Sequence, residues 1–233
     1  MLKEEWEIDS DPWRRRLLAI QEHAAACWAA PVERRDAAEH RRHILAVARR
    51  LVAERGVDGV SMQQIARAAG VGQGTLYRRY AHKGALYMAL LTENVARAQE
   101  EVRTYLASCG PSTPARAQLE YVLSRHVAFN EENAPLLSAA FEAACGPHRA
   151  AHYDNPLYIV MRQTVETLLE RAVARGEAPP CDTAYMADAI LASLAIDLYI
   201  HQRAERGFTP ERIMAAIRQL YIDGRCSDAG QTG

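Results

Sequence analysis

The chain has 233 residues, of which 49% are hydrophobic and 24% charged, a composition typical of a globular protein with a sizeable core. Its five cysteines are scattered without a Cys-x-x-Cys pair, which disfavours a disulfide framework and fits a reducing compartment. No apolar run reaches the roughly 20 residues that span a bilayer, and the acidic start differs from a signal peptide. We therefore expect a cytoplasmic protein with no membrane partner.

The charge is unevenly distributed along the chain. Residues 33–90 contain eleven Lys or Arg and five Asp or Glu, whereas residues 91–233 contain thirteen and eighteen. A basic segment of this kind beside an acidic body indicates that one part of the protein meets a polyanion and the other does not.

The first predicted helix follows Ser10-Asp11-Pro12, a cap followed by a proline in the first helical turn. All three tryptophans, including Trp13 and Trp28, lie in the first 32 residues. A disordered tail rarely carries tryptophans, so we expect an ordered extra helix packed on another part of the protein. The alternative is a start codon assigned too far upstream.

The basic segment divides into short helices. The pattern predicts a helix from His40 to Arg55, which Gly56 ends. A capping box of Ser61 and Gln64 opens a second helix that continues to residue 68. A third helix covers residues 72–80, and a fourth begins near residue 82 and continues past residue 90.

Beyond a break at residues 109–112, every remaining element reads as a helix, and no strand or repeat is evident. The predicted ranges are 115–130, 134–144, 156–175, 183–206 and 210–222. The sequence thus predicts an all-α protein with four parts: an N-terminal extension with one helix (1–35), a basic domain of short helices (36–90), a helical bundle (91–225) and a flexible tail (226–233).

Two short helices joined by a tight turn with Gly70, on a basic segment, form the pattern of a helix-turn-helix. The core side of the second helix carries Val71, Leu76 and Tyr80. The other faces carry Gln73, Thr75, Tyr77, Arg78 and Arg79. Gly72 and Gly74 would leave backbone N–H groups bare near a phosphate. Glutamine can pair with adenine, and arginine with guanine or phosphate. The expected partner is therefore double-stranded DNA.

The same segment resembles a known protein family. The segment from Ile44 to Leu91, above all IARAAGVGQGTLYRRYAHKGALYMALL, resembles the N-terminal domain of TetR/AcrR-family transcriptional regulators. The family implies an all-helical homodimer that usually represses transcription and releases DNA when a small molecule binds the C-terminal domain. By position, Gln73 would read a base and Lys83 would bind a phosphate. Gln63, Thr75, Tyr77, Arg78 and Arg79 match other contact positions. Gly72 and Tyr80 depart from the serine and phenylalanine common in the family.

The C-terminal helices are expected to hold the effector and the partner subunit. Helical phase selects candidate ligand-binding residues for a small, mostly hydrophobic effector: His126, Phe129, Asn130, Phe141, Tyr158, Met161 and Arg162. Apolar stripes on the last helices select candidate residues for a dimer interface, part of which must pack inside: Ile190, Leu194, Leu198, Ile213, Ile217 and Leu220. The family assigns such helices to a dimer interface, which would place two recognition helices on a near-palindromic operator.

Other functions are less well supported by the sequence. Cys145, His148 and His152, with Asp154, are metal-ligand types at plausible spacing, but their polar stretch is more typical of a solvated loop. We expect no metal and no cofactor. Common enzyme motifs are missing, so we expect no enzyme, although a small-molecule enzyme on a helical scaffold stays open. The second functional alternative is a helix-turn-helix regulator that acts through protein partners and binds DNA weakly.

Overall fold

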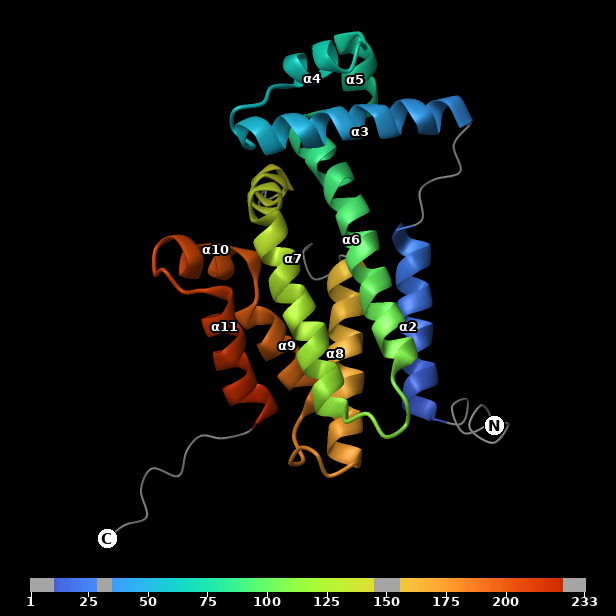
Figure 1. Ribbon diagram of the computed structural model, residues 1–233, viewed down its shortest axis with the longest axis vertical. Coiled ribbons are helices and arrows are strands. Elements are labelled where there is room, and N and C mark those ends of the chain that lie inside the picture. The colour runs from blue at the N-terminus through green and yellow to red at the C-terminus, as the bar shows by residue number, and fades with distance from the viewer. Residues whose placement is uncertain (1–10, 29–34, 145–155, 224–233) are drawn as a thin grey trace. The chain divides into compact units, whose positions relative to one another are not determined.

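The computed structural model describes residues 11–28, 35–144 and 156–223, and the regular structure in these ranges is entirely helical (Figure 1). The chain forms two compact units. The helix-turn-helix unit combines residues 28–97 with 133–149, and the bundle unit combines residues 1–27, 98–132 and 150–233. The all-α fold class is therefore confirmed, whereas the domain boundaries drawn from the sequence stay predictions.

The helix-turn-helix unit is built from α3 (Arg35–Arg55), α4 (Met62–Ala68), α5 (Gln73–Arg79), the start of α6 (Lys83–Ser108) and the end of α7 (Ala115–Ala144). Its core contains apolar side chains from α3, α4, α5 and α6. Ile65 of α4 and Leu76 of α5 are both 0% exposed and meet Leu45 of α3 and Leu86 of α6 in one cluster. Burying each such side chain contributes about 1.5–3 kcal/mol, so the short α4 and α5 are held by packing.

Local signals fix where α4 begins and ends. The Ser61 hydroxyl accepts a hydrogen bond from the Gln64 backbone N–H at 3.2 Å, and the Gln64 side chain accepts one from the Ser61 N–H at 2.7 Å. This confirms the predicted capping box. Gly70 adopts a φ of +65°, the left-handed conformation that ends a helix and that glycine adopts without strain.

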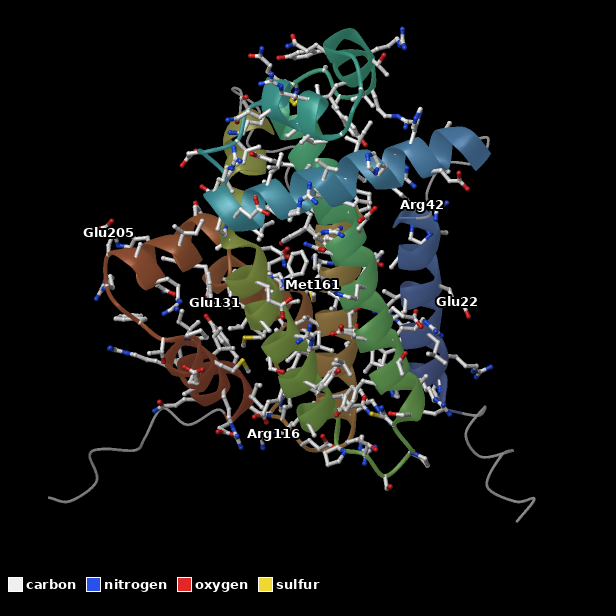
Figure 2. All side chains as sticks on the ribbon, turned by 45° about the horizontal axis from the view of Figure 1, so that its top comes forward. Glu22, Arg42, Arg116, Glu131, Met161 and Glu205 are labelled. Atoms are coloured by element: carbon white, nitrogen blue, oxygen red, sulfur yellow. The ribbon has the colours of Figure 1, made fainter. Side chains whose placement is uncertain are left out.

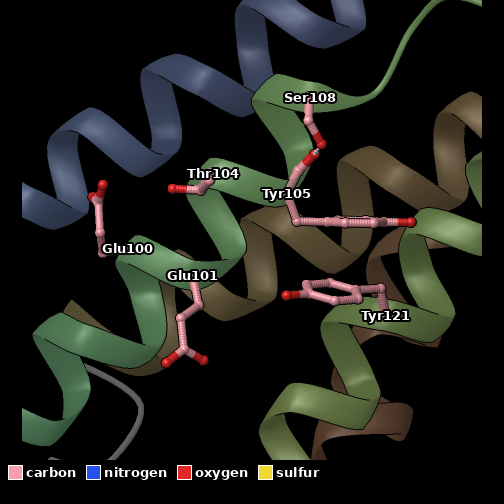
Figure 3. Close-up of a pocket in the computed structure, with 6 residues that line it drawn as sticks. All are labelled: Glu100, Glu101, Thr104, Tyr105, Ser108 and Tyr121. Carbon is pink, nitrogen blue, oxygen red and sulfur yellow. Dashed lines mark hydrogen bonds between the residues drawn. The ribbon is translucent and has the colours of Figure 1, made fainter.

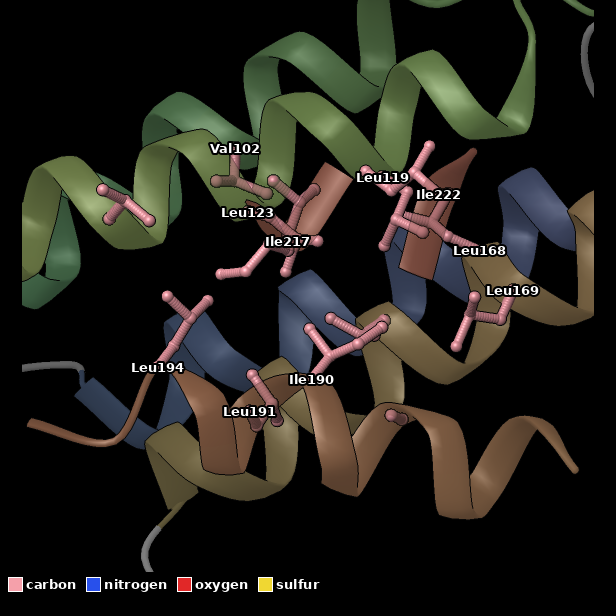
Figure 4. Packing of buried hydrophobic residues seen from close by; sticks show 14 of the residues in the cluster. Val102, Leu119, Leu123, Leu168, Leu169, Ile190, Leu191, Leu194, Ile217 and Ile222 are labelled. Atoms are coloured by element: carbon pink, nitrogen blue, oxygen red, sulfur yellow. The ribbon is translucent and has the colours of Figure 1, made fainter. Parts of the chain in front are cut away.

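The bundle unit contains α2 (Pro12–Trp28), the second half of α6, the first part of α7, α8 (Pro156–Ala174), α9 (Thr183–Ser193), α10 (Ile196–Ala204), α11 (Pro210–Ile217) and the π-helical turn η2 (Arg218–Ile222). Figure 4 shows its core, in which Val102 of α6, Leu123 of α7 and Leu168 of α8 converge with Ile190 of α9. In Figure 2, Met161 lies among these helices, whereas Glu205 is exposed after α10.

The leading helix α2 is an integral layer of the bundle unit. The Asp11 carboxylate caps it by accepting the Trp13 N–H at 3.0 Å. Leu17 is 2% exposed and belongs to the bundle core. The buried Gln21 amide donates to the Thr164 hydroxyl of α8 at 2.9 Å. The expectation of an ordered extra helix is confirmed, and its packing surface is the bundle unit.

A buried ion pair adds to this attachment. The Arg171 guanidinium, 3% exposed as a residue, donates to Asp11 Oδ2 at 2.8 Å and to the Gln118 side-chain oxygen at 2.9 Å. One arginine of α8 thereby holds the start of α2 and the start of α7. Because both acceptors lie next to a buried guanidinium, loss of any member would leave a buried polar group without its partner.

Several predicted helices differ from those observed. The ranges 115–130 and 134–144 form the single helix α7, which continues through Pro135. A proline inside a helix costs about 3 kcal/mol, and packing on both sides of it offsets this cost: Val127 before it lies in the bundle core, while Leu136 and Ala139 after it pack against the core of the helix-turn-helix unit. The range 210–222 changes to π-helical geometry after Ile217.

The predicted helix 183–206 is broken into α9 and α10, which meet at an angle of 42°. The Asn130 side chain of α7 donates to the Leu194 carbonyl at the break, at 2.9 Å, and so satisfies a group that the end of α9 leaves without a helical donor. Among the described helices none is long and apolar enough by itself to cross a membrane; α9 and α10 meet those criteria only as a bent pair.

The structure corrects part of the predicted dimer interface. Four of its residues lie in the core of the chain's own bundle unit, with exposures of 5% or less: Ile190, Leu194, Ile213 and Ile217. The last helices are apolar on two faces, and the structure turns these four residues inward. Leu198 and Leu220 remain on the surface, at 39% and 59% exposure.

Candidate nucleic-acid interface

The turn between α4 and α5 is tight and held by backbone hydrogen bonds. The Gly70 N–H donates to the Arg67 carbonyl at 3.2 Å, and the Val71 N–H donates to the Ala66 carbonyl at 3.0 Å. Gly72 then serves as the N-cap of α5 without any side-chain cap. Leu76 and Tyr80 anchor α5 in the core at 0% and 6% exposure, which fixes the rotation of this seven-residue helix.

That rotation leaves most of the predicted DNA-contacting residues exposed together. On α5 and its N-cap these are Gly72, Gln73, Gly74, Thr75, Tyr77 and Arg78. Tyr77 is 49% exposed, which is unusual for a tyrosine with no core role. Gln63 is exposed on α4. The helix thus presents an amide, a hydroxyl, a phenol and a guanidinium, all able to donate hydrogen bonds to phosphates or base edges.

The two glycines of this face are not required by packing within the chain. A Cβ on Gly72 would meet only the Thr75 hydroxyl, at 3.8 Å, and a Cβ on Gly74 would meet nothing within 4 Å. Neither glycine has a positive φ. Neither packing nor backbone conformation within the chain therefore requires glycine at positions 72 and 74. Gly70 differs, because its φ of +65° favours glycine.

Two predicted contact residues are partly engaged inside the unit. The Arg79 guanidinium donates to the Ala37 carbonyl at 2.9 Å and so links the end of α5 to the start of α3. Lys83 is half-buried, with its Nζ 5.4 Å from the centre of the Tyr87 ring. The Tyr87 hydroxyl donates to the Val57 carbonyl at 2.9 Å. Burial, with the Asp58 charge, raises the pKa of Tyr87 to about 12, so this anchor stays protonated.

A cavity of about 290 Å³ lies between α3 and α5. Its lining residues are Ala37, His40, Ile44, Val71, Thr75, Arg78 and Arg79. The sequence predicted a helix start at His40, but α3 begins at Arg35, and the additional turn supplies one wall of this cavity. His40 is not among the contact residues predicted from the sequence, although its spacing of four residues from the buried Ile44 places both on one side of α3.

The predicted effector-binding residues have different environments in the bundle unit. Phe129 and Asn130 are buried, and Asn130 is committed to the Leu194 carbonyl. The Tyr158 hydroxyl and the Arg162 Nε both donate to Asp188 Oδ1 at 2.9 Å. Met161 packs against the core. Phe141 lies in α7, but its side chain is outside the described part of the chain.

His126 is half-buried in α7, and burial lowers its pKa to about 4. The imidazole is therefore neutral at physiological pH and offers one donor and one acceptor. A neutral imidazole beside apolar side chains suits an uncharged ligand better than an anion.

Sequence reasoning missed a second cavity, of about 370 Å³, on the bundle unit between α6 and α7 (Figure 3). It is lined by Glu100, Glu101, Thr104, Tyr105, Ser108 and Tyr121. The rings of Tyr105 and Tyr121 stack with centroids 3.6 Å apart, which leaves no space for a ligand between them. Arg103 and Arg125 already pair with the two carboxylates. Each group of this cavity thus has a partner within the chain.

No group of three His, Cys, Asp or Glu side chains within residues 11–28, 35–144 and 156–223 could hold a metal ion. The sequence motif of Cys145, His148, His152 and Asp154 lies outside these ranges, as does the predicted tail at 226–233.

Comparisons with known proteins agree with this geometry. Residues 44–90 match the family model of bacterial regulatory proteins, tetR family. The chain is 25% identical over 198 residues to HTH-type transcriptional regulator SAB2452 of Staphylococcus aureus (strain bovine RF122 / ET3-1), a match that covers 82% of this chain and 96% of that protein.

Two solved structures show the same fold. A transcriptional regulator from Saccharomonospora viridis in complex with choline aligns with a TM-score of 0.62 at 20% identity, over 78% of this chain and 95% of that one. AibR in complex with isovaleryl coenzyme A and operator DNA aligns with a TM-score of 0.54 at 20% identity, over 78% and 98%. At these identities the likeness concerns the fold alone.

Proposed function

The chain belongs to the TetR family of bacterial regulatory proteins, and from this premise we propose that it is a cytoplasmic, ligand-responsive repressor that binds a near-palindromic operator as a homodimer. The observation that carries the proposal is the rotation of α5. Leu76 and Tyr80 lock one face into the core, while Gln73, Thr75 and Arg78 are exposed on the rest of the helix.

The exposed residues divide into two roles. Gln73 near the start of α5 is the base reader, because a glutamine amide can form two hydrogen bonds to adenine in the major groove. Thr75, Tyr77, Arg78 and Lys83 bind phosphates and set the register of α5 on the duplex. Gln63 contributes from α4, which crosses the DNA backbone in this class of motif.

In this proposal the DNA-binding form of the protein contains a second copy of the chain. Leu198 and Leu220 are large apolar residues left exposed on the last helices, and Tyr185 of α9 is 72% exposed. Pairing through this surface would remove apolar area from water in both copies. Two recognition helices would then meet successive major grooves roughly 35 Å apart.

The effector is a small, mostly hydrophobic molecule bound by the bundle unit. The neutral His126 of α7, and Met161 of α8, which packs against the bundle core, support an uncharged or apolar group. Structural neighbours carry choline in one case and an acyl coenzyme A with operator DNA in another. Release follows if the effector binds better to a dimer whose recognition helices no longer match adjacent grooves.

The alternative, in which the leading helix recruits a protein partner, has less support. Leu17 and Ala24 of α2 are 2% and 0% exposed within the chain, so these apolar residues are already covered. A partner would have to bind the outer, polar side of α2.

Fluorescence anisotropy with labelled duplex from the region upstream of the chain's own gene tests the proposal. We expect binding that a scrambled duplex does not match and that weakens steeply between 50 and 200 mM salt, as counterion release requires. Gln73→Ala should lose the preference for the operator while it retains non-specific binding. Folded protein that binds neither duplex at low salt would refute DNA binding.

A further inference from the structure

We infer that the cavity between α3 and α5 is the seat of one DNA backbone phosphate, and that His40 of α3 is a DNA contact. The inference rests on the proposed DNA binding and extends the interface beyond α4, α5 and Lys83 to the first helix of the helix-turn-helix unit. It follows from where the cavity lies, what lines it and how its walls are held.

The cavity adjoins the face that reads DNA. One wall is formed by residues 37, 40 and 44, which lie on one side of α3. The other wall is formed by residues 75, 78 and 79, which lie on one side of the recognition helix α5. Thr75 and Arg78 therefore belong both to the cavity and to the exposed face of α5. A duplex docked on α5 has its backbone next to this opening.

The lining has the chemistry of an anion site. Among the side chains that the structure describes, its polar lining is an imidazole, a hydroxyl and two guanidinium groups, without a carboxylate. The apolar Ile44 and Val71 supply the remaining side-chain surface. Phosphate oxygens accept hydrogen bonds from all four polar groups, whereas a cation would find no negative charge there. The volume of about 290 Å³ is ample for a phosphate with its sugar edge.

The two walls are held in a fixed relation before DNA arrives. Arg79 donates to the Ala37 carbonyl at 2.9 Å, directly across the cavity from α5 to α3. Ile44 and Leu76, one from each wall helix, are 2% and 0% exposed in the same core cluster. A site with this support loses little conformational freedom when the phosphate binds.

A gain of charge tests the assignment without weakening the fold, because His40 is exposed. In His40→Lys, a fixed cation enters the cavity, so the slope of log affinity against log salt should steepen by about one for each bound protomer. The matched control is His43→Lys, the same substitution on the same helix at an exposed residue that does not line the cavity. Its slope should stay near that of the unaltered protein.

A loss of one donor separates phosphate from base. Thr75→Val keeps the shape of the side chain and removes its hydroxyl. It should weaken binding to the upstream duplex and to the scrambled duplex by the same factor, about tenfold. Loss confined to the upstream duplex would reassign Thr75 to a base and would overturn the phosphate seat.

The outcomes also separate this inference from the proposed function. If His40→Lys and His43→Lys steepen the slope equally, the cavity is not a phosphate seat, even though salt-dependent binding by the unaltered protein upholds DNA binding. If the unaltered protein shows no salt-dependent binding to either duplex, DNA binding itself fails and the phosphate seat fails with it.

Discussion

The helix-turn-helix unit and the bundle unit place their polar residues in opposite ways. In the helix-turn-helix unit the core is almost wholly apolar, and the chemistry-bearing side chains of α5 are exposed. Six of the seven polar residues that are buried in the described ranges belong to the bundle unit: Gln21, Gln118, Asn130, Thr164, Thr167 and Arg171. One unit is organised to meet a polar partner, and the other is held together by polar pairs of its own.

This difference predicts that polar substitutions in the two units change different properties of the protein. Polar changes in the bundle unit should alter the free energy of unfolding, because buried groups such as those of Gln21, Asn130 and Arg171 depend on partners inside the chain. Polar changes on α5 or at Lys83 should alter DNA affinity and leave stability close to its starting value.

The largest effect is expected from Arg171→Ala. It leaves the Asp11 carboxylate and the Gln118 amide without their shared donor, so the free energy of unfolding should fall by about 3–5 kcal/mol. Urea unfolding followed by circular dichroism measures the change. Arg16→Ala, which removes an exposed pair between α2 and Glu170 of α8, is the control and should cost less than about 1 kcal/mol. Equal losses would contradict the special role of the buried pair.

Next comes Leu17→Ala on the leading helix. Leu17 is 2% exposed in the bundle core, so the truncation should lower the free energy of unfolding by about 2–4 kcal/mol. Ala19→Ser, at an exposed position of the same helix, should change it by less than about 0.5 kcal/mol. A negligible cost for Leu17→Ala would mean that α2 is not part of the folded bundle in solution.

A smaller effect concerns pH. The pKa of His126 is lowered to about 4 by burial, below the usual value near 6.5. Between these two values the unfolded chain binds a proton that the folded chain does not, so stability falls as the pH falls through this window. His126→Gln should therefore lose about 1–2 kcal/mol less than the unaltered protein when the pH is lowered from 7 to 5. Urea midpoints at both pH values measure this.

The smallest effect on stability is expected from Lys83→Ala, which removes one proposed phosphate contact. The slope of log affinity against log salt should flatten by about one for each bound protomer. The free energy of unfolding should fall by no more than about 1 kcal/mol, the value of the cation–π contact with Tyr87. If Lys83→Ala greatly lowers stability and leaves the slope unchanged, Lys83 stabilises the helix-turn-helix unit and is not a phosphate contact.

The sequence predicted best what short-range chemistry decides. The capping box of Ser61 and Gln64 and the left-handed Gly70 act within four residues of their own positions, so α4 and the turn after it could be read from the chain. The helix-turn-helix pattern placed Gln73 and its neighbours on the third predicted helix, and the resemblance to a known family then implied the role of base reader for Gln73.

The remaining features depend on residues far apart in the chain. The break after α9 is stabilised by Asn130, 64 residues earlier, and the Arg79 hydrogen bond reaches Ala37, 42 residues earlier. The sequence predicts a helix boundary near Pro135, because it does not show the packing that stabilises α7 before and after this residue. Apolar residues such as Ile190 and Leu198 look alike in a sequence, and only the fold separates a core residue from a surface one.

The attachment of α2 has a consequence for the order in which the protein can assemble during synthesis. Gln21 and Asp11 are bonded to residues 143 and 160 positions later, so α2 is made long before these partners on α8. Residues 44–90, which supply the whole buried core around α4 and α5, are complete before that point. The core of the helix-turn-helix unit can therefore form during synthesis before the contacts between α2 and α8, and closure of the bundle is a late, long-range event.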